Sequence, residues 1–278
     1  MKRNKDYLLG TSNQELQRLG YQHQVWQDVT ETLWRNARFG FGQSILDLGC
    51  GPGFASIELA RLVGPDGRIE AIDAAETFLT PLQKSLDAAG LDQVRVQQGN
   101  AQEIPLPDCS VDRVWVRWLM CFVADPSRVC EEISRVLRPG GKVVIWDYYN
   151  YLSVNVFPEQ AAIHRIFQAY YQSALKSGGS FDIAQYLPGM LLNCGLEVEQ
   201  LLPINRAARP GSVTWQWVSL FHDSYLPKLV EQGLMGETEA VEFRAAWQDA
   251  SNNPAAFFFT PPMLGIIASK PLGQSGTS

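Results

Sequence analysis

The sequence predicts an α/β fold with a doubly wound, mostly parallel sheet. Two observations lead to this prediction. Between residues 44 and 147, short apolar segments of strand type alternate with longer segments that have the apolar spacing of helices. A turn with glycines at positions 49, 51 and 53 joins the first strand to the helix that follows it. In such sheets ligands bind at the carboxyl ends of the strands, so the turn indicates a binding site.

The glycine turn follows a buried strand over 44–48 and precedes a helix over 54–63. Glycine lets the backbone approach a ligand without an intervening Cβ, and the free N–H groups at a helix N-terminus favour an anionic group. The turn should therefore hold a cofactor. Its spacing is Gly-x-Gly-x-Gly, with Phe54 where a dinucleotide-binding turn needs a small residue. This disfavours a nicotinamide or flavin.

The segment before the first strand should form one long helix. Ser12 and Glu15 make a capping-box pair at its start. A histidine on the apolar face of such a helix is more often a hydrogen-bonded core residue than a catalyst, so we interpret His23 as a packing residue. The positions that share this face are Leu16, Leu19, His23, Trp26, Thr30, Leu33 and Ala37.

After the glycine turn the alternation of strand and helix continues. Asp125 followed by Pro126 is a helix start, and this helix should run to Leu137. The strands expected after the first lie at 68–73, 94–98 and 110–116, and a fifth ends near Asp147.

Beyond residue 147 the pattern changes to helical segments rich in aromatic residues. Residues 158–176 have the spacing of an amphipathic helix, which ends at the glycines of 177–180, and 211–251 should be a second helical insertion. The remaining elements expected are a helix at 183–194, a strand at 196–204, a last strand at 256–268 bent at Pro261-Pro262, and a disordered tail at 273–278.

These motifs resemble those of the class I S-adenosylmethionine-dependent methyltransferases. Residues 47–53, Asp-Leu-Gly-Cys-Gly-Pro-Gly, resemble motif I of that family, and Asp73 stands where an acid suits two ribose hydroxyls. Residues 98–107 resemble the segment that lines the adenine, with Asn100 where Asp is more usual; Asn keeps the carbonyl acceptor. The resemblance is strong over 44–147 and is to the small-molecule, natural-product branch.

The resemblance implies S-adenosylmethionine as the cofactor. In small-molecule members an N-terminal segment commonly lies over the cofactor, so Tyr7 could contact it; an ordinary aromatic anchor is an equally open interpretation. The residues expected around the cofactor are Asp47, Gly49, Cys50, Gly51, Gly53, Asp73, Ala74, Asn100, Ala101, Arg117 and Tyr7.

The resemblance also implies a Rossmann-like sheet of seven strands, with an antiparallel last strand, helices on both faces and helical cap insertions. On this basis we divide the chain into an N-terminal helical lid (1–39), a cofactor-binding core (40–147), a cap insertion (148–180), a further core segment (181–210), a second cap insertion (211–251), the last core strand (252–272) and the tail (273–278).

Composition disfavours several other classes. The net charge is −6 and Lys and Arg are scattered, so a nucleic-acid partner is not expected. No apolar run reaches the roughly 20 residues that cross a bilayer, and no signal-type region follows the N-terminus, so we expect a cytoplasmic protein without a membrane partner. The five cysteines form no Cys-x-x-Cys or Cys/His cluster, and 117–122 lack the carboxylates of metal-dependent relatives. No metal is expected.

Methyl transfer from a sulfonium needs mainly an aligned nucleophile in a dry pocket, so a general base is optional. The candidates for a base or an orienting group are His164, His222 and Asp147. Each has a competing interpretation, as a packing or surface histidine or as an acid that caps a turn. The substrate pocket is predicted from aromatic residues near the strand ends and in the caps: Trp118, Tyr148, Tyr149, Trp217 and Phe221.

The predicted function is methyl transfer to an oxygen or nitrogen, less often a carbon, of a small apolar or aromatic metabolite. Two alternatives stay open. One is a non-methylating reaction such as a cyclisation on the same fold, and the other is a cofactor-binding accessory subunit without turnover. The N-terminal helix and the cap helices are the surfaces through which a homo-oligomer could form.

Overall fold

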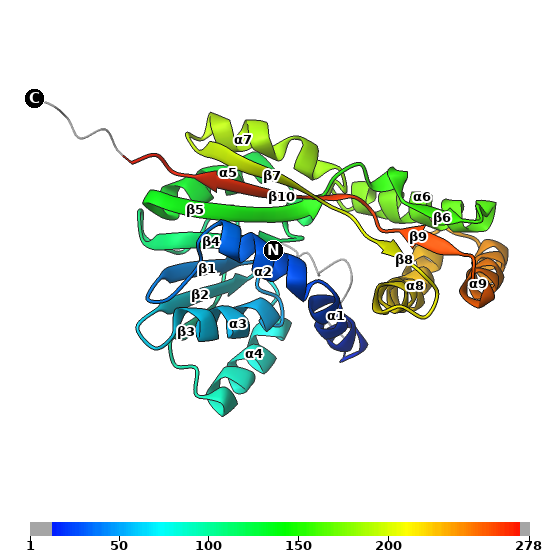
Figure 1. The fold of residues 1–278 in the computed structure, drawn as a ribbon, viewed down its shortest axis with the longest axis horizontal. Coiled ribbons are helices and arrows are strands. Elements are labelled where there is room, and N and C mark those ends of the chain that lie inside the picture. The colour runs from blue at the N-terminus through cyan, green and yellow to red at the C-terminus, as the bar shows by residue number, and fades with distance from the viewer. Residues whose placement is uncertain (1–12, 273–278) are drawn as a thin grey trace, which may run out of the picture.

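The computed structural model describes residues 13–272 and contains the predicted seven-stranded sheet (Figure 1). The strand order is β3-β2-β1-β4-β5-β10-β7. Strands β1 to β5 pair in parallel, whereas β10 is antiparallel to both of its neighbours, which confirms the predicted sheet. These strands are β1 (Ser44–Leu48), β2 (Arg68–Asp73), β3 (Val94–Gln98), β4 (Val111–Arg117), β5 (Leu137–Tyr148), β7 (Glu197–Ile204) and β10 (Met263–Ser269).

The strand order places a topological switch point between β1 and β4. From β1 the chain runs outward to β3, then returns to β4 on the other side of β1 and continues to β5. Ligands of open α/β sheets bind outside the carboxyl ends of the strands at such a point. The glycine turn follows β1, and Arg117 ends β4. Both predicted site segments therefore lie where the topology favours a ligand.

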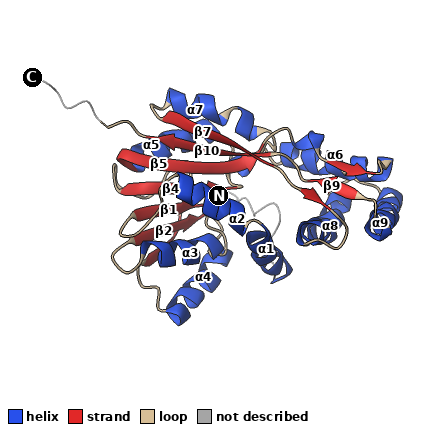
Figure 2. Ribbon diagram, in the orientation of Figure 1, coloured by secondary structure: helices blue, strands red, loops and turns tan. Residues whose placement is uncertain are grey.

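Helices cover both faces of the sheet (Figure 2). In the view of Figure 1, α2 (Gln27–Asn36) and α3 (Phe54–Val63) lie in front of the strands and α5 (Pro126–Val136) lies behind them. The packing of α2 is close, because a Cβ at Gly265 of β10 would come within 2.7 Å of Cδ2 of Leu33. The α5 helix begins as predicted, with the Asp125 carboxylate accepting the N–H of Arg128 at 3.0 Å. The other core helix of this half is α4 (Glu76–Ala89).

The predicted single N-terminal helix is two helices. The structure has α1 (Asn13–Val25) and α2, separated at Trp26, while Ser12 lies outside the described residues. The Trp26 side chain is fully buried, with its ring centroid 5.4 Å from that of Trp217 and 5.6 Å from that of Trp146. Apolar spacing continues across Trp26, so periodicity alone could not show the break.

The predicted last strand at 256–268 is divided between two sheets. Residues Phe257–Phe259 form β9 in a small sheet of order β6-β9-β8, and only β10 belongs to the main sheet. The change of sheet occurs at Pro261-Pro262, because proline has no N–H to continue a ladder. Of residues 252–272, only β10 therefore lies in the main sheet. The other strands of the small sheet are β6 (Asn155–Phe157) and β8 (Ala207–Ala208).

The cap helices gather around this small sheet, at the right-hand end of the molecule in Figure 1. They are α6 (Ala161–Lys176), α8 (Val213–Glu231) and α9 (Glu237–Asn252). The predicted helix at 183–194 is shorter than expected, since α7 (Leu187–Asn193) follows a separate 3-10 turn at Ile183–Gln185 and has proline in its first turn. The other 3-10 turns are Met120–Phe122 and Tyr151–Ser153.

Candidate functional site

The glycine turn between β1 and α3 has a backbone shape that glycine adopts readily. Gly49, Gly51 and Gly53 have φ of +76°, +53° and +80°. A Cβ at Gly53 would lie 2.1 Å from Cδ1 of Leu82, so packing also requires glycine there. A Cβ at Gly51, in contrast, would meet no atom of the described chain within 4 Å. The space beside Gly51 is therefore open to a ligand that approaches the backbone closely.

Asp73, at the end of β2, is joined to the glycine turn by its own carboxylate. Its Oδ2 accepts the N–H of Gly51 at 2.8 Å, and its Oδ1 accepts the N–H of Ala75 at 2.8 Å. Burial raises the pKa of Asp73, and the bonds from Ala75 and Gly51 offset part of that rise. Asp73 is thus a partly buried acid that fixes the turn, and not a solvated surface carboxylate. The neighbouring Ala74 is exposed.

Asp47 and Cys50 lie inside the fold. Asp47 is 2% exposed, and its Oδ2 accepts the hydroxyl of Ser56 at 2.5 Å. Burial raises the pKa of Asp47 to about 6. Burial also raises the pKa of the Cys50 thiol. The Asp47 bond ties the end of β1 to the first turn of α3, so this acid shapes the glycine turn from within the fold.

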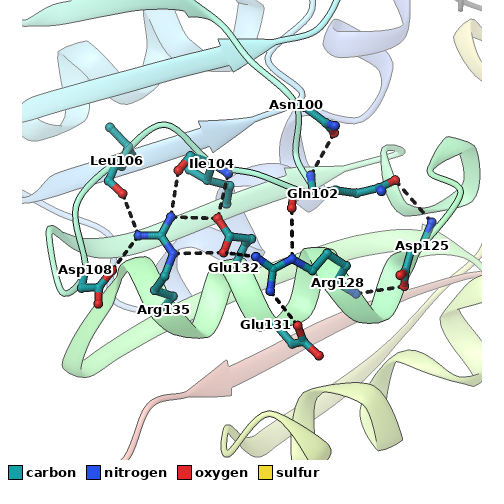
Figure 3. Close-up of polar contacts among 10 residues, drawn as sticks. All are labelled: Asn100, Gln102, Ile104, Leu106, Asp108, Asp125, Arg128, Glu131, Glu132 and Arg135. Carbon is teal, nitrogen blue, oxygen red and sulfur yellow. Dashed lines mark hydrogen bonds and ion pairs between the residues drawn. The ribbon is translucent and has the colours of Figure 1, made fainter. Parts of the chain in front are cut away.

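The predicted adenine segment, which carries Asn100 and Ala101, is held against α5 (Figure 3). Asn100 is exposed, and its Oδ1 accepts the N–H of Gln102 at 3.0 Å, while Ala101 is buried. The carbonyl of Gln102 accepts Nε of Arg128 at 3.2 Å. The acceptor that Asn100 shares with Asp is therefore used to shape the loop.

Glu132 of α5 is the hub of this arrangement (Figure 3). It is 3% exposed, and its Oε2 accepts the N–H of Ile104 and Nη2 of Arg135, each at 2.8 Å. Its Oε1 accepts Nη2 of Arg128 at 3.0 Å. The bonds from Arg135 are the main reason that the pKa of Glu132 lies below its usual value. Arg128 and Arg135 lie on α5 itself, but no local pattern indicated the bond to Ile104, which lies on a loop 28 residues earlier.

Arg117, at the end of β4, is held by the N-terminal helices. Its Nη2 lies 3.1 Å from Nδ1 of His23, and its Nη1 donates to the hydroxyl of Thr30 at 3.3 Å. Because arginine can only donate, His23 accepts at Nδ1 and carries its proton on Nε2, which lies 3.1 Å from Oε1 of Glu58. Burial lowers the pKa of Arg117 to about 10, and the charges of Asp47 and Glu58 oppose that effect. Among residues 13–272, Arg117 forms no ion pair with a surface carboxylate, and His23 is a buried, hydrogen-bonded residue as predicted.

A pocket with mostly aromatic walls lies beside the exit of β4. Its empty volume is about 550 Å³ with the solvent at its mouth included. Trp118 enters the wall from a left-handed backbone position with φ of +50°. The next residue, Leu119, packs so closely on Gly49 that a Cβ there would lie 3.1 Å from Cδ1. The wall residue Trp118 is thus adjacent in sequence to a residue that packs on the glycine turn. The pocket is lined by Arg18, Gln22, Trp118, Phe122, Tyr148, Tyr151, Phe167, Trp217, Val218, Phe221, Phe258 and Pro261.

Four of the five predicted pocket residues belong to this wall; the exception is Tyr149. Its side chain is 42% exposed, and it lies just beyond the end of β5, whereas Tyr148 lines the pocket. The sequence interpretation missed Arg18 and Gln22. Their spacing of i, i+4, i+8 with Trp26 was the signal that could have indicated them.

None of the three candidates for proton transfer lines the pocket. His164 is exposed on α6, and His222 is buried in the cap with its Nδ1 2.7 Å from the hydroxyl of Tyr170. Burial lowers the pKa of His222 to about 3. The fully buried Asp147 accepts the N–H groups of Cys121 and Tyr148, and burial raises its pKa to about 6. The structure thus shows Asp147 capping a turn.

Tyr7 lies outside the described residues, so its contact with the cofactor stays a prediction. Two further observations hold for residues 13–272. No helix in this range is long and apolar enough to span a bilayer. Within the same range, no three His, Cys, Asp or Glu side chains gather as a metal ion would require.

The sheet order, the glycine turn and the acid at the end of β2 together define a class I S-adenosylmethionine-dependent methyltransferase fold. A family profile described as a methyltransferase domain matches residues 46–145. Residues 46–145 are therefore similar to methyltransferase domains, whose cofactor is S-adenosylmethionine. The open space beside Gly51 and the acid held next to it fit that cofactor.

Known proteins resemble the chain over different lengths. A demethylmenaquinone methyltransferase of Listeria welshimeri is 30% identical over 164 residues, which are 59% of this chain and 65% of that protein. An uncharacterised 37.1-kDa protein of a Streptomyces fradiae transposon is 30% identical over 216 residues, 74% of this chain and 60% of its own. The chain thus spans less than two thirds of these relatives. Among solved structures, the [4+2]-cyclase SpnF has a TM-score of 0.58 at 19% identity, covering 88% of this chain and 82% of the cyclase, which is similarity of fold.

Proposed function

We propose that this chain transfers a methyl group from S-adenosylmethionine to an oxygen or nitrogen, less often a carbon, of a small apolar or aromatic metabolite. The observation that carries the proposal is the position of the aromatic pocket. Trp118 in its wall is adjacent in sequence to Leu119, which packs on the first glycine of the turn. An acceptor in the pocket would therefore lie next to the cofactor. The Listeria relative is named for a small-molecule substrate, which supports this class of acceptor.

The described residues favour catalysis by alignment and exclusion of water. S-adenosylmethionine, when bound, supplies an electrophilic methyl group on a sulfonium centre. The aromatic wall would hold the acceptor in line with that group, and alignment of reactants can lower a barrier by roughly 7–11 kcal/mol. A general base typically contributes about 10²–10⁴ in rate, and none of the three predicted candidates reaches the wall. The proposal therefore assigns no residue as an obligatory base.

Product mass tests the proposal directly. The protein is incubated with S-adenosylmethionine and with metabolites made by the enzymes that neighbouring genes encode. Products are followed by mass spectrometry. Methyl transfer makes a product heavier by one CH2 group and releases an equal amount of S-adenosylhomocysteine. A cyclisation, the reaction in the name of SpnF, would leave the substrate mass unchanged and consume no cofactor. A non-catalytic subunit would bind the cofactor and convert no compound.

We also propose that 1–39, 148–180 and 211–251 act together as a lid over the site. Support comes from the wall itself, to which α1 contributes Gln22, α6 contributes Phe167 and α8 contributes Trp217. Closure of such a lid would exclude water from the reacting groups.

Hydrogen exchange measures lid closure. With S-adenosylhomocysteine and an acceptor bound, exchange should slow in the N-terminal helices and in both insertions, because their backbones become shielded from water. The reference is the protein without ligands. Protection confined to 47–54, 73 and 99–101 would contradict the lid and would favour an oligomer interface for the extra helices.

A further inference from the structure

The apolar pocket contains an amide that has no hydrogen-bond acceptor in the described chain. Gln22 lines the wall, and its Oε1 accepts both Nη1 of Arg18 at 2.8 Å and Nε1 of Trp217 at 3.0 Å. Arginine and the indole can only donate, so this end of the amide is its oxygen. The amide nitrogen makes no hydrogen bond with any residue of 13–272, and it is not sealed from the pocket.

Two phenol hydroxyls of the same wall also lack a hydrogen-bond partner among the described residues. Tyr148 and Tyr151 line the pocket with their ring centroids 5.4 Å apart. Neither hydroxyl makes a hydrogen bond with any residue that the structure describes, and neither is sealed off. Burial raises the pKa of both phenols above the usual value, so both remain hydroxyl donors at neutral pH. The wall therefore offers one amide and two hydroxyl donors among aromatic rings.

Hydrogen bonds hold the Gln22 amide in one orientation, and a fixed donor favours a role in ligand recognition. Arg18, which is 4% exposed, is fixed by two bonds to Glu15, at 2.8 Å from Nε and 2.7 Å from Nη2. Its bond to Gln22, together with that of Trp217, fixes the plane of the amide. Hydrogen bonds in such a chain polarise one another, which strengthens the remaining donor. Arg18 is thus a positioning residue for Gln22.

We infer that the acceptor molecule has an apolar or aromatic ring body that bears oxygen atoms, one of which receives the Gln22 amide while another receives the Tyr148 and Tyr151 hydroxyls. This inference rests on the proposed function and narrows its substrate to oxygenated ring compounds. A bound ligand would cover these donors, and a covered donor without a partner is costly, so an oxygen atom at each position is favoured over a hydrocarbon. A pocket selected for pure hydrocarbon would have no such donors.

A pair of bicyclic probes tests the inference. 1-Tetralone and tetralin share one ring system, and only the former has a carbonyl oxygen. Binding to the full chain saturated with S-adenosylhomocysteine is followed by the fluorescence of the wall tryptophans, Trp118 and Trp217. The wild-type protein should bind 1-tetralone about five- to tenfold more tightly than tetralin, the range expected for one net hydrogen bond.

The variant Gln22→Glu is nearly isosteric. It keeps an oxygen for Arg18 and Trp217 and replaces the amide donor with an acceptor. This variant should bind 1-tetralone and tetralin with about equal affinity, and its affinity for tetralin should change little. The matched control is Gln216→Glu, which adds the same charge at an exposed position whose oxygen accepts the Tyr21 hydroxyl at 2.9 Å. This control should keep the wild-type preference.

Equal wild-type affinity for the two probes, binding of neither, or an unchanged preference in a folded Gln22→Glu variant would each overturn the inference. If Gln22→Glu does not fold, Tyr148→Phe and Tyr151→Phe are measured in its place, since each removes only an oxygen atom. At least one of them must then lower the preference about two- to fivefold. S-adenosylhomocysteine binding is measured first. Its absence would refute the proposed function itself, whereas its presence with an unchanged probe preference refutes only this inference.

Discussion

Asp73→Ala should weaken the binding of S-adenosylmethionine by roughly five- to 150-fold, which corresponds to about 1–3 kcal/mol. The loss has two sources. The substitution removes the carboxylate expected to bind the ribose hydroxyls, and it frees the N–H groups of Gly51 and Ala75 that this carboxylate now accepts. Because the second effect loosens the glycine turn, we expect a result in the upper part of the range. Titration calorimetry measures it.

Two further variants test whether the loss of cofactor affinity is specific to the Asp73 carboxylate. Asp73→Asn keeps one acceptor oxygen, so its loss of affinity should be smaller than that of the alanine variant. Asp66→Ala removes an exposed acid from the turn before β2 and should leave the affinity unchanged. A folded Asp73→Ala protein with wild-type calorimetry would show that the acid at the end of β2 has no part in cofactor binding.

Glu132→Ala should lower the free energy of unfolding by roughly 2–3 kcal/mol. The substitution leaves the N–H of Ile104 without its acceptor and removes three contacts to guanidinium groups. The side chains of Arg128 and Arg135 are 46% and 30% exposed, so water replaces part of what they lose. Urea denaturation measures the change. Cofactor affinity should fall as well, because the loop that carries Asn100 and Ala101 depends on this hub.

The neighbouring acid provides the control. Glu131 contacts Arg128 with a side chain that is 56% exposed, so Glu131→Ala should change stability by less than about 0.5 kcal/mol. Equal losses of unfolding free energy in Glu131→Ala and Glu132→Ala would contradict the central role of Glu132.

The pH dependence of folding stability follows from the lowered pKa of Glu132. A lowered pKa stabilises the fold above the unfolded value of about 4.3, and this stabilisation is lost as pH falls through the folded pKa. The stability difference between wild type and Glu132→Gln should therefore be present at about pH 7 and shrink below about pH 4.

Much of the core fold was predictable, because its signals are local. The strands of the parallel sheet are short segments with apolar or alternating patterns between turn residues, and their alternation with helices restricts the topology. Two of the errors in the predicted elements have one physical origin. Trp26 interrupts a helix without interrupting its apolar spacing, and Phe257–Phe259 leave the main sheet although their composition suits it. In both places tertiary contacts decide a conformation that periodicity leaves open.

The sequence by itself determined the sheet, the glycine turn and the position of Asp73. Left-handed glycines and an acid that ends a strand are properties of a few adjacent residues. The sequence indicated four aromatic residues of the wall, but only the tertiary structure brought them together with the donors. The donors of the pocket come from α1 and from the exit of β5, and its rings come from α6, α8 and β9, so no local pattern relates them. The same holds for His164, His222 and Asp147, since whether a polar side chain faces a ligand or the core depends on neighbours that are distant in sequence.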